Sequence, residues 1–440
     1  MKKHFLALSL VATSGLIAQD AAETGTHQEQ NGYCNSCCCS PCCCKPCCVP
    51  KPKKCIDCEC YTPAYYDLEC DWGLFLDAEF LYWYARETNL GYAAKIQAKP
   101  RTVVSDEVLE PRLVFAPNRI QNINTDWEPG FRVGVGWSSG CDGWDYFLHW
   151  TWMRNRETRS TTVDNTYALI GTTTDPMYAA EDEFLLLNPW INASFHNVNV
   201  DNNINSNLLT FDKVSARWQL QNYNSVDLEI GRKYWLSKCF TLRPYAAIRG
   251  AWHKTTFQTT STRNFENELT SDTIAFSFKD RFRNRCWGAG ILGGLQPNWH
   301  FCSNFILFSN FDVALIWGEF EAQKRETYLG TSISNGTTTI DPNYCNSFNH
   351  KFFQMTAILD TAIGFRWEEC WCCDSMRSAL DIGWEHHIWF DQNHRIKSYD
   401  FTSASVGASP VVAESGFRGF AEATGNLMLG GLVVRLRLDF

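Results

Sequence analysis

Cysteine is the most concentrated reactive residue of this chain. Of its 21 cysteines, 12 lie between Cys34 and Cys60. CxxC spacing occurs four times in that segment, at Cys34 and Cys37, Cys39 and Cys42, Cys44 and Cys47, and Cys55 and Cys58. Thiolates at this spacing bind zinc in a reducing compartment, whereas thiols in an oxidising compartment form disulfides. The chemistry of these cysteines therefore depends on where the chain resides.

The first eighteen residues predict a signal peptide and hence export. Lys2 and Lys3 give a positive start, and the apolar stretch 5–18 is too short to span a membrane as a helix. An exported chain meets oxidising conditions, so we expect disulfides. Metal binding and unpaired thiols are the alternatives that the spacing leaves open. We expect no resident metal and no cofactor.

A second set of reactive residues is charged and alternates with large apolar residues. In residues 74–84, for example, Asp77 and Glu79 are separated from the apolar set by the period of two that defines a β-strand. An Arg or Lys facing hydrocarbon at the bilayer midplane would cost about 2–4 kcal/mol, so a charged face needs water or opposite charges. The pattern predicts strands with one lipid-facing and one lumen-facing side.

The charged faces identify candidate pore-lining residues. They are Asp77, Glu79, Arg132, Asp145, Arg217, Asp227, Glu229, Arg243, Arg249, Asp312, Asp360, Arg366, Arg435 and Arg437. Facing rows of opposite charge can line an aqueous channel and set its selectivity. Alternatively, they pair across neighbouring strands and fill a narrow lumen.

Ten segments carry this alternation and must position the charges. They are residues 74–84, 131–137, 144–152, 226–230, 240–252, 287–295, 311–317, 353–367, 380–390 and 428–440. Short links at 138–143, 237–239, 296–302 and 368–376 alternate with long polar links at 86–128, 154–212, 254–285, 318–351 and 391–425. Short periplasmic turns and long extracellular loops are typical of an outer-membrane β-barrel.

The fold class that we predict is therefore all-β: a transmembrane antiparallel β-barrel of ten strands. A hidden hairpin in 154–212 or 254–285 would raise the count to 12 or 14. We divide the chain into a signal peptide (1–18), a disordered Cys/Pro-rich periplasmic arm (19–71) and the barrel (72–440), with surface-exposed loops.

A soluble β-sandwich is the main alternative for alternation alone. The segments are longer than the ~5–6 residues usual in soluble sheets, and aromatic residues recur near their ends, as in an interfacial girdle. The chain also ends on a strand, with Leu436, Leu438 and Phe440 on one face. This ending is similar to the assembly signal of other bacterial barrels. These features favour the barrel.

The cysteines outside the arm gather at the short links, on the predicted periplasmic side. The crosslink candidates are Cys34, Cys37, Cys38, Cys39, Cys42, Cys43, Cys44, Cys47, Cys48, Cys55, Cys58, Cys60, Cys70, Cys141, Cys239, Cys302, Cys370, Cys372 and Cys373. Only Cys286 and Cys345 fall outside this pattern. We expect a disulfide network that joins the barrel to neighbours or to periplasmic proteins, with local pairing among turn cysteines as the alternative.

Four segments carry a resemblance to a known family: Ala78-Glu79-Phe80-Leu81-Tyr82-Trp83, Pro129-Gly130-Phe131-Arg132-Val133-Gly134, Leu242-Arg243-Pro244-Tyr245 and the final strand. In these segments the chain resembles the Legionella-type and chlamydia-like major outer membrane protein family. The similarity covers roughly residues 72–440 discontinuously. The resemblance implies an abundant surface barrel that acts as a general diffusion pore, and it implies no catalytic residues. The cysteine arm departs from it.

Two functional classes follow from these observations. One is a pore for small hydrophilic solutes or ions in the outer membrane; the other is a non-conducting structural or adhesive barrel. The net charge of −9 argues against nucleic acid as a partner. An enzyme is not expected. Among the candidates His386, His387 and Asp391, the adjacent histidines point to opposite faces of a strand and cannot act together, and the sequence has no G-x-S-x-G nucleophile elbow. Lipid, envelope proteins and further copies of the chain are the partners that remain.

Overall fold

The protein is described by a computed structural model. It describes residues 62–63, 68, 72–105, 108–139, 143–163, 184–191, 211–267, 272–301, 304–334, 337–340, 344–371, 375–401 and 417–440. The predicted signal peptide, Cys34 to Cys60 and Cys70 lie outside these residues. So do the turn cysteines Cys141, Cys302, Cys372 and Cys373. The division of the chain at 18 and 71 therefore stays a prediction.

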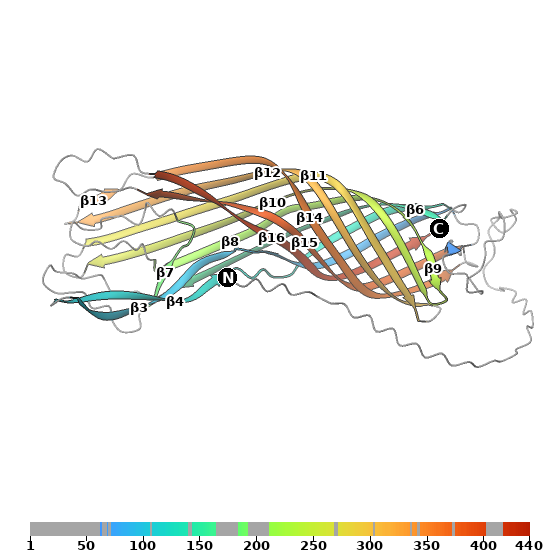
Figure 1. Cartoon of the computed structure of the whole chain (residues 1–440), viewed down its shortest axis with the longest axis horizontal. Coiled ribbons are helices and arrows are strands. Elements are labelled where there is room, and N and C mark those ends of the chain that lie inside the picture. The colour runs from blue at the N-terminus through green and yellow to red at the C-terminus, as the bar shows by residue number, and fades with distance from the viewer. Residues whose placement is uncertain are drawn as a thin grey trace, which may run out of the picture. The chain divides into compact units, whose positions relative to one another are not determined.

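Ten antiparallel strands close into a ring (Figure 1). They are β2 (Leu74–Glu87), β5 (Glu128–Ser138), β6 (Trp144–Thr162), β8 (Lys213–Arg232), β10 (Phe240–Asn267), β11 (Asp272–His300), β12 (Phe305–Ser334), β14 (Tyr344–Trp371), β15 (Met376–Phe401) and β16 (Phe417–Asp439). Each pairs with the next along the chain, and β16 pairs with β2. The predicted β-barrel and its count of ten are confirmed.

Six further strands accompany the ring. β3 (Gly91–Ser105), β4 (Val108–Asn122) and β7 (Phe184–Leu187) form a separate sheet, within two segments predicted as long links. β9 (Tyr234–Ser237) pairs with β1 (Thr62–Pro63) and β10, and β13 (Thr337–Ile340) pairs with β12. None of these described strands enters the ring, so the alternatives of 12 or 14 strands are wrong for the described residues. No helix among the described residues is long and apolar enough to cross a membrane.

Both faces of the membrane-crossing part follow the alternation. Leu76, Phe80 and Ile291 are exposed outward, whereas Asp77 and Glu79 are buried inside. Aromatic side chains gather at the upper limit of the apolar band, where Trp127 stacks on Tyr82 and meets Trp384 edge to face. Such girdles mark the interfaces of a membrane barrel.

Two links predicted to be loops are strand instead. β10 continues to Asn267, β11 begins at Asp272 and β12 continues to Ser334, so the wall reaches far beyond the 9–11 residues that cross a bilayer. Above the membrane the pattern is reversed, with polar residues outside and Phe257 and Phe282 buried inside. The sequence predicts loops at 254–285 and 318–351 because membrane strands are identified by their apolar outer face. A wall that stands in water has a polar outer face and lacks this signal.

A β-bulge reverses the faces of β8. Asn222 has a positive φ of 51°, and two residues of β8 at this point oppose one residue of each neighbouring strand. One extra residue exchanges the inward and outward sets, because side chains alternate with a period of two. Arg217 is therefore exposed on the outside while Trp218 is buried inside, and the prediction that Arg217 faces the lumen is wrong.

Candidate functional site

The short-turn half of the lumen contains a cavity of about 740 Å³. It extends from the short-turn rim, where Cys239 is exposed, to Trp83 and Tyr223 further up the barrel. Twelve of the predicted pore-lining residues border it: Glu79, Arg132, Asp145, Asp227, Glu229, Arg243, Arg249, Asp312, Asp360, Arg366, Arg435 and Arg437. Asp77 is buried next to it and accepts a hydrogen bond from Arg435.

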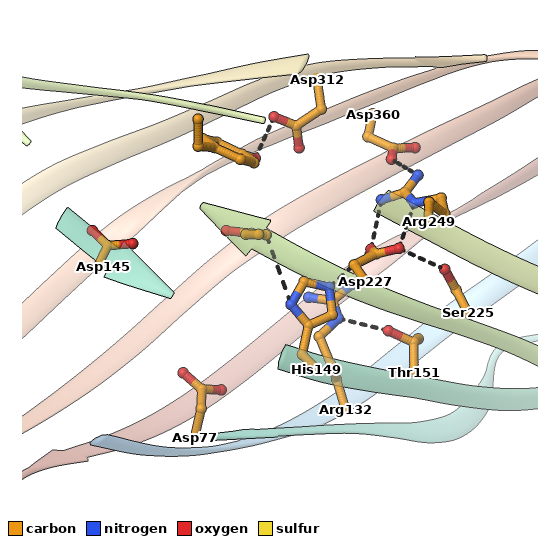
Figure 2. A network of polar contacts seen from close by, with 12 residues as sticks. Asp77, Arg132, Asp145, His149, Thr151, Ser225, Asp227, Arg249, Asp312 and Asp360 are labelled. Atoms are coloured by element: carbon orange, nitrogen blue, oxygen red, sulfur yellow. Dashed lines mark hydrogen bonds and ion pairs between the residues drawn. The ribbon is translucent and has the colours of Figure 1, made fainter. Parts of the chain in front are cut away.

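Arg249 is the centre of one network in this cavity (Figure 2). Its Nε and Nη2 donate to the two carboxylate oxygens of Asp227, each at 2.8 Å, and Nη1 donates to Asp360. Ring nitrogens of His149 and His387 approach these carboxylates at 2.9 and 2.8 Å. A bidentate arginine is the strong form of this contact, and the network joins polar groups of five wall strands: β6, β8, β10, β14 and β15.

Arg132 joins a second group of charges. It contacts Glu79 of β2 and, at 2.9 Å, Glu385 of β15. His387 lies 3.3 Å from Glu385 and so connects this group with Asp360. Because β2, β5, β14 and β15 all contribute, the network crosses the point where the ring closes.

Towards the short-turn rim the same arrangement recurs. Arg243 contacts both Asp145 and Glu229, the latter at 3.1 Å. Arg366 donates to both oxygens of Asp381 at 2.7 and 2.8 Å. The described lumen therefore follows the second alternative drawn from the sequence, in which charges pair across strands. The cavity shows that this pairing leaves room between them.

Further lumen residues were absent from the predicted pore-lining set. His149, Asp381, Glu385, His387 and Asp439 border the same cavity. His149 and Asp439 lie in the same alternation phase as the predicted Asp145 and Arg437 of their strands. Asp381, Glu385 and His387 share one phase of β15, opposite to its apolar residues, so the sequence pattern contained the signal there too. Their pairing with particular arginines did not follow from it.

An aromatic layer bounds the cavity on the long-hairpin side. It consists of Trp83, Tyr223, His253 and Trp389, all buried. The Tyr223 and Trp389 rings are 5.9 Å apart and the His253 and Trp389 rings 5.5 Å apart, both edge to face. Aromatic contacts of this geometry are favourable beyond the area that they bury. The layer separates the polar cavity from the upper lumen.

Trp190 occupies the lumen above this layer. Trp190 follows β7, a strand that does not belong to the ring. Its indole nitrogen donates to the Gly91 carbonyl at 2.7 Å. Its ring packs edge to face on Phe257 and Phe282 of the wall. The neighbouring Asn188 donates to Thr259 and Ser261 at 3.0 and 2.9 Å. The segment 184–191 is thus anchored inside the barrel.

β15 supplies the other part of this filling. Its pairing with β14 ends at Trp389, next to a bulge at Asp391 with φ of 49°. The following residues are buried against β11 and β12: Asn393 accepts from Asn284 at 3.0 Å and Ser398 from Lys324 at 3.1 Å. The outer part of β15 therefore lies in the lumen instead of continuing the wall.

Buried cations contact both the segment around Trp190 and the outer part of β15. Arg395 of β15 is 1% exposed, donates to Glu87 at 2.6 Å and lies over the rings of Phe257 and Trp190. Lys324 of β12 is equally buried and donates to the Trp190 carbonyl at 3.3 Å. Burial lowers the pKa of Arg395 to about 10, against the opposing effect of Glu87. The term plug is used below for Trp190, Arg395 and Lys324 together with the rings of Phe257 and Phe282.

His386 and His387 lie on opposite faces of β15. His387 is in the lumen network, whereas His386 lies near Tyr84 of the outer aromatic girdle. Asp391 is exposed in the bulge. These three residues do not form a common site. Within the described part of the chain, no cluster of three or more His, Cys, Asp or Glu is placed to hold a metal.

The described cysteines divide between the two ends of the barrel. Cys239 and Cys370 are exposed and border the cavity at the short-turn rim. Cys286 is buried in the wall and Cys345 is exposed on the long-hairpin side, and both have free thiols. This division follows the expected grouping for the described cysteines. The disulfide network itself stays a prediction.

Comparison with known proteins identifies a family. A family model described as the Legionella pneumophila major outer membrane protein precursor matches residues 69–440. No curated protein matches the chain. Solved structures with a similar fold include the Escherichia coli outer membrane protease OmpT (10% identity, TM-score 0.31, covering 86% of this chain and 98% of that chain). A Pseudomonas aeruginosa FadL homologue is also similar (6% identity, TM-score 0.20, covering 84% and 90%). Likenesses of this size carry no argument about function.

The Arg249 network predicts a large effect on stability. Arg249→Met should lower the free energy of unfolding by about 3–5 kcal/mol, because it leaves buried carboxylates without their cation. Adding Asp227→Asn and Asp360→Asn should restore most of the loss. Urea unfolding in lipid vesicles, followed by tryptophan fluorescence, measures both. Arg154→Met, at an exposed outward position, is the control; equal stability of the two single variants would contradict the prediction.

Asp280, above the membrane on β11, predicts a pH dependence. It is 3% exposed, and burial raises its pKa to about 7, with Glu326 adding to the rise and Lys324 opposing it. Since the folded pKa lies above the ordinary value of 3.8, the protonated form favours folding, and this stability is lost as pH rises from about 4 to 7.

Asp280→Asn should therefore match the wild type at pH 4 and be more stable by on the order of a few kcal/mol at pH 8. Hydrogen exchange of the outer halves of β10 and β11 at both pH values is the measurement. Asp126→Asn, an exposed carboxylate, is the control and should show no such difference. A gain for Asp280→Asn that is the same at both pH values would argue against titration of this group.

Proposed function

This chain belongs to the family of the Legionella pneumophila major outer membrane protein, and on that premise we propose that it forms a narrow, gated pore for small hydrophilic solutes or ions. The observation that carries the proposal is the 740 Å³ cavity in the lumen, which charged residues line and which reaches exposed residues at the short-turn rim. Such a cavity does not stabilise a barrel in the bacterial outer membrane, because the side chains around an empty volume lose van der Waals contacts.

The closure of the upper lumen supports gating. Trp190 and the outer part of β15 fill it: Trp190 lies beyond the end of β7, a strand that is not part of the ring, and β15 has lost its pairing with β14 there while it stays paired with β16. Trp190 is held in the lumen by ring contacts and by the side-chain hydrogen bonds of Asn188, so it can leave without breaking the backbone ladder of the ring. The wall would then stay closed while the lumen opens. Displacement of Trp190 from the upper lumen is the step that we assign to opening.

The paired charges would govern what passes. Arg249 and Arg132 lie opposite acidic groups from several strands, so an ion in the lumen meets both signs within a few ångströms. Such a lumen favours neither cations nor anions strongly and excludes apolar solutes by desolvation of the charges. A general passage for small polar solutes is the function that this lining supports.

A non-conducting structural or adhesive barrel is the second candidate. The same plug favours it, because a lumen filled by buried Trp190, Arg395 and Lys324 blocks passage as long as these residues stay in place. We further propose that either function operates in a barrel crosslinked by disulfides on its short-turn side, where Cys239 and Cys370 are exposed. Envelope proteins or further copies of the chain are the partners expected there.

Conductance separates the two candidates. The barrel refolded into a planar lipid bilayer should give discrete current steps, and Trp190→Ala should raise the conductance or the open fraction several-fold by removing the ring from the lumen. Trp299→Ala, which removes an outward-facing ring near the short-turn end, is the control. Folding is checked by the shift between heated and unheated samples on gels. Folded barrels that never conduct, in all three forms, would move the function to the structural candidate.

Crosslinking is tested on the envelope itself. Membranes extracted without reductant, with free thiols blocked at once, should contain high-mass species of this chain that collapse to monomer when reductant is added. Cys239→Ser combined with Cys370→Ser should shift the pattern to smaller species, whereas Cys286→Ser, at a buried wall position, should leave it unchanged. Monomer in the presence and absence of reductant would refute the crosslinking proposal.

A further inference from the structure

A group of cations lies on the outer surface of the barrel just above the apolar band. It consists of Lys254 on β10, Arg281, Arg283 and Arg285 on β11, Arg325 on β12 and Lys351 on β14, and is called the outer basic patch below. Each of these residues lies in the outward-facing alternation phase of its strand, and none lines the lumen. Their side chains point sideways from the barrel wall.

The register places these cations side by side. Lys254 is directly opposite Arg285, and Arg281 is directly opposite Arg325. Like charges directly opposite on neighbouring strands destabilise a sheet. The pKa of Arg283 is lowered by partial burial and then by Arg281 and Arg285, which shows how closely the positive charges lie. The wall thus tolerates a repulsion that a bound anion would relieve.

Acidic residues of the same surface do not balance the patch. Glu321 lies 3.6 Å from Arg285 and 3.9 Å from Lys351, and Glu319 lies 3.9 Å from Lys351. These contacts are long and their cations are more than half exposed, and such pairs contribute little. Within the described residues no carboxylate forms an ion pair with Lys254, Arg281, Arg283 or Arg325. The patch keeps a net positive charge.

The height of the patch identifies what it faces. Trp252 and Trp287 are directly opposite each other, and both are exposed outward with Trp317 nearby. Trp252 comes two residues before Lys254, and Trp287 comes two residues after Arg285 on the antiparallel strand. Exposed tryptophans at this position mark the membrane interface, and two residues of strand span about 7 Å. The patch therefore lies at the level of the lipid headgroups, on the side of the long hairpins.

We propose that the outer basic patch binds the phosphate groups of a phosphorylated lipid of the outer leaflet, whose acyl chains pack on the tryptophans and aliphatic residues below. Arginine forks match phosphate oxygens in geometry and charge. The apolar band would contact the acyl tails of a phospholipid or phosphoglycolipid, and the cations above it would contact the phosphorylated headgroup. Because the patch faces the plane of the membrane, a lipid reaches it without leaving the leaflet. The proposal does not depend on conduction through the lumen.

Native mass spectrometry of the detergent-solubilised barrel tests the site by counting retained lipids. The probes are a bis-phosphorylated glucosamine lipid and the same lipid without its phosphates. The wild type should retain the phosphorylated form at least about tenfold better, and Arg281→Gln with Arg283→Gln and Arg285→Gln should remove most of this preference. Arg86→Gln with Arg119→Gln and Lys213→Gln removes the same charge at exposed positions elsewhere and should retain it.

Arg281→Gln alone keeps the test decisive if the triple variant does not fold. It removes one member of a repelling pair, so the lipid-free barrel should be at least as heat-stable as the wild type while its preference for the phosphorylated lipid falls. Equal retention of the two lipids by the wild type would overturn the proposal, as would an equal loss in the control triple variant. Displacement of the lipid by millimolar inorganic phosphate would identify a site for free anions instead.

Discussion

Each membrane-crossing strand separates two environments, and the charges on its inner face must be neutralised by partners on other strands. Arg249 contacts Asp227 and Asp360, and Arg132 contacts Glu79 and Glu385. No single hairpin contains such a set, so the network exists only when the ring is closed. In a low-dielectric surrounding an unpaired member would be costly, which makes the closed ring and the paired lumen one cooperative unit. The outer apolar face and the inner charge network are therefore consequences of the same constraint.

Beyond the bilayer this constraint is reversed. The wall continues in β10, β11 and β12, but its outer face meets water and its inner face is packed with Phe257, Phe282 and Trp190. The lumen thus changes along one barrel from a charged cavity to a packed half in which aromatic rings surround a few buried ion pairs, with Trp83, Tyr223, His253 and Trp389 at the boundary. The cavity therefore occupies the short-turn half. The upper half is closed by inserted segments because its aromatic rings pack against Trp190.

The two ends of the barrel are thereby suited to different partners. Exposed Cys239 and Cys370 lie at the short-turn rim, on the side where the cysteine-rich arm is expected. The outer basic patch lies at the opposite limit of the apolar band, at headgroup level. Covalent attachment on one side and lipid recognition on the other would fix the barrel in the envelope through different chemistries. Neither arrangement draws on the residues that line the lumen.

The sequence alone determined the fold class, the ten wall strands, the side on which turns are short and twelve of the charged residues that border the cavity. It could do so because a period of two is a local property that each strand expresses by itself. The tertiary structure decided what depends on relations between strands. The bulge at Asn222, a single residue with positive φ, turned Arg217 outward without any sign in the alternation of its neighbours. The strands beyond the membrane were missed because water on their outer face removes the apolar signal. The pairing of Arg249 with Asp360 and the contact of Lys324 with the inserted Trp190 join residues 111 and 134 positions apart, and only closure of the ring brings them together.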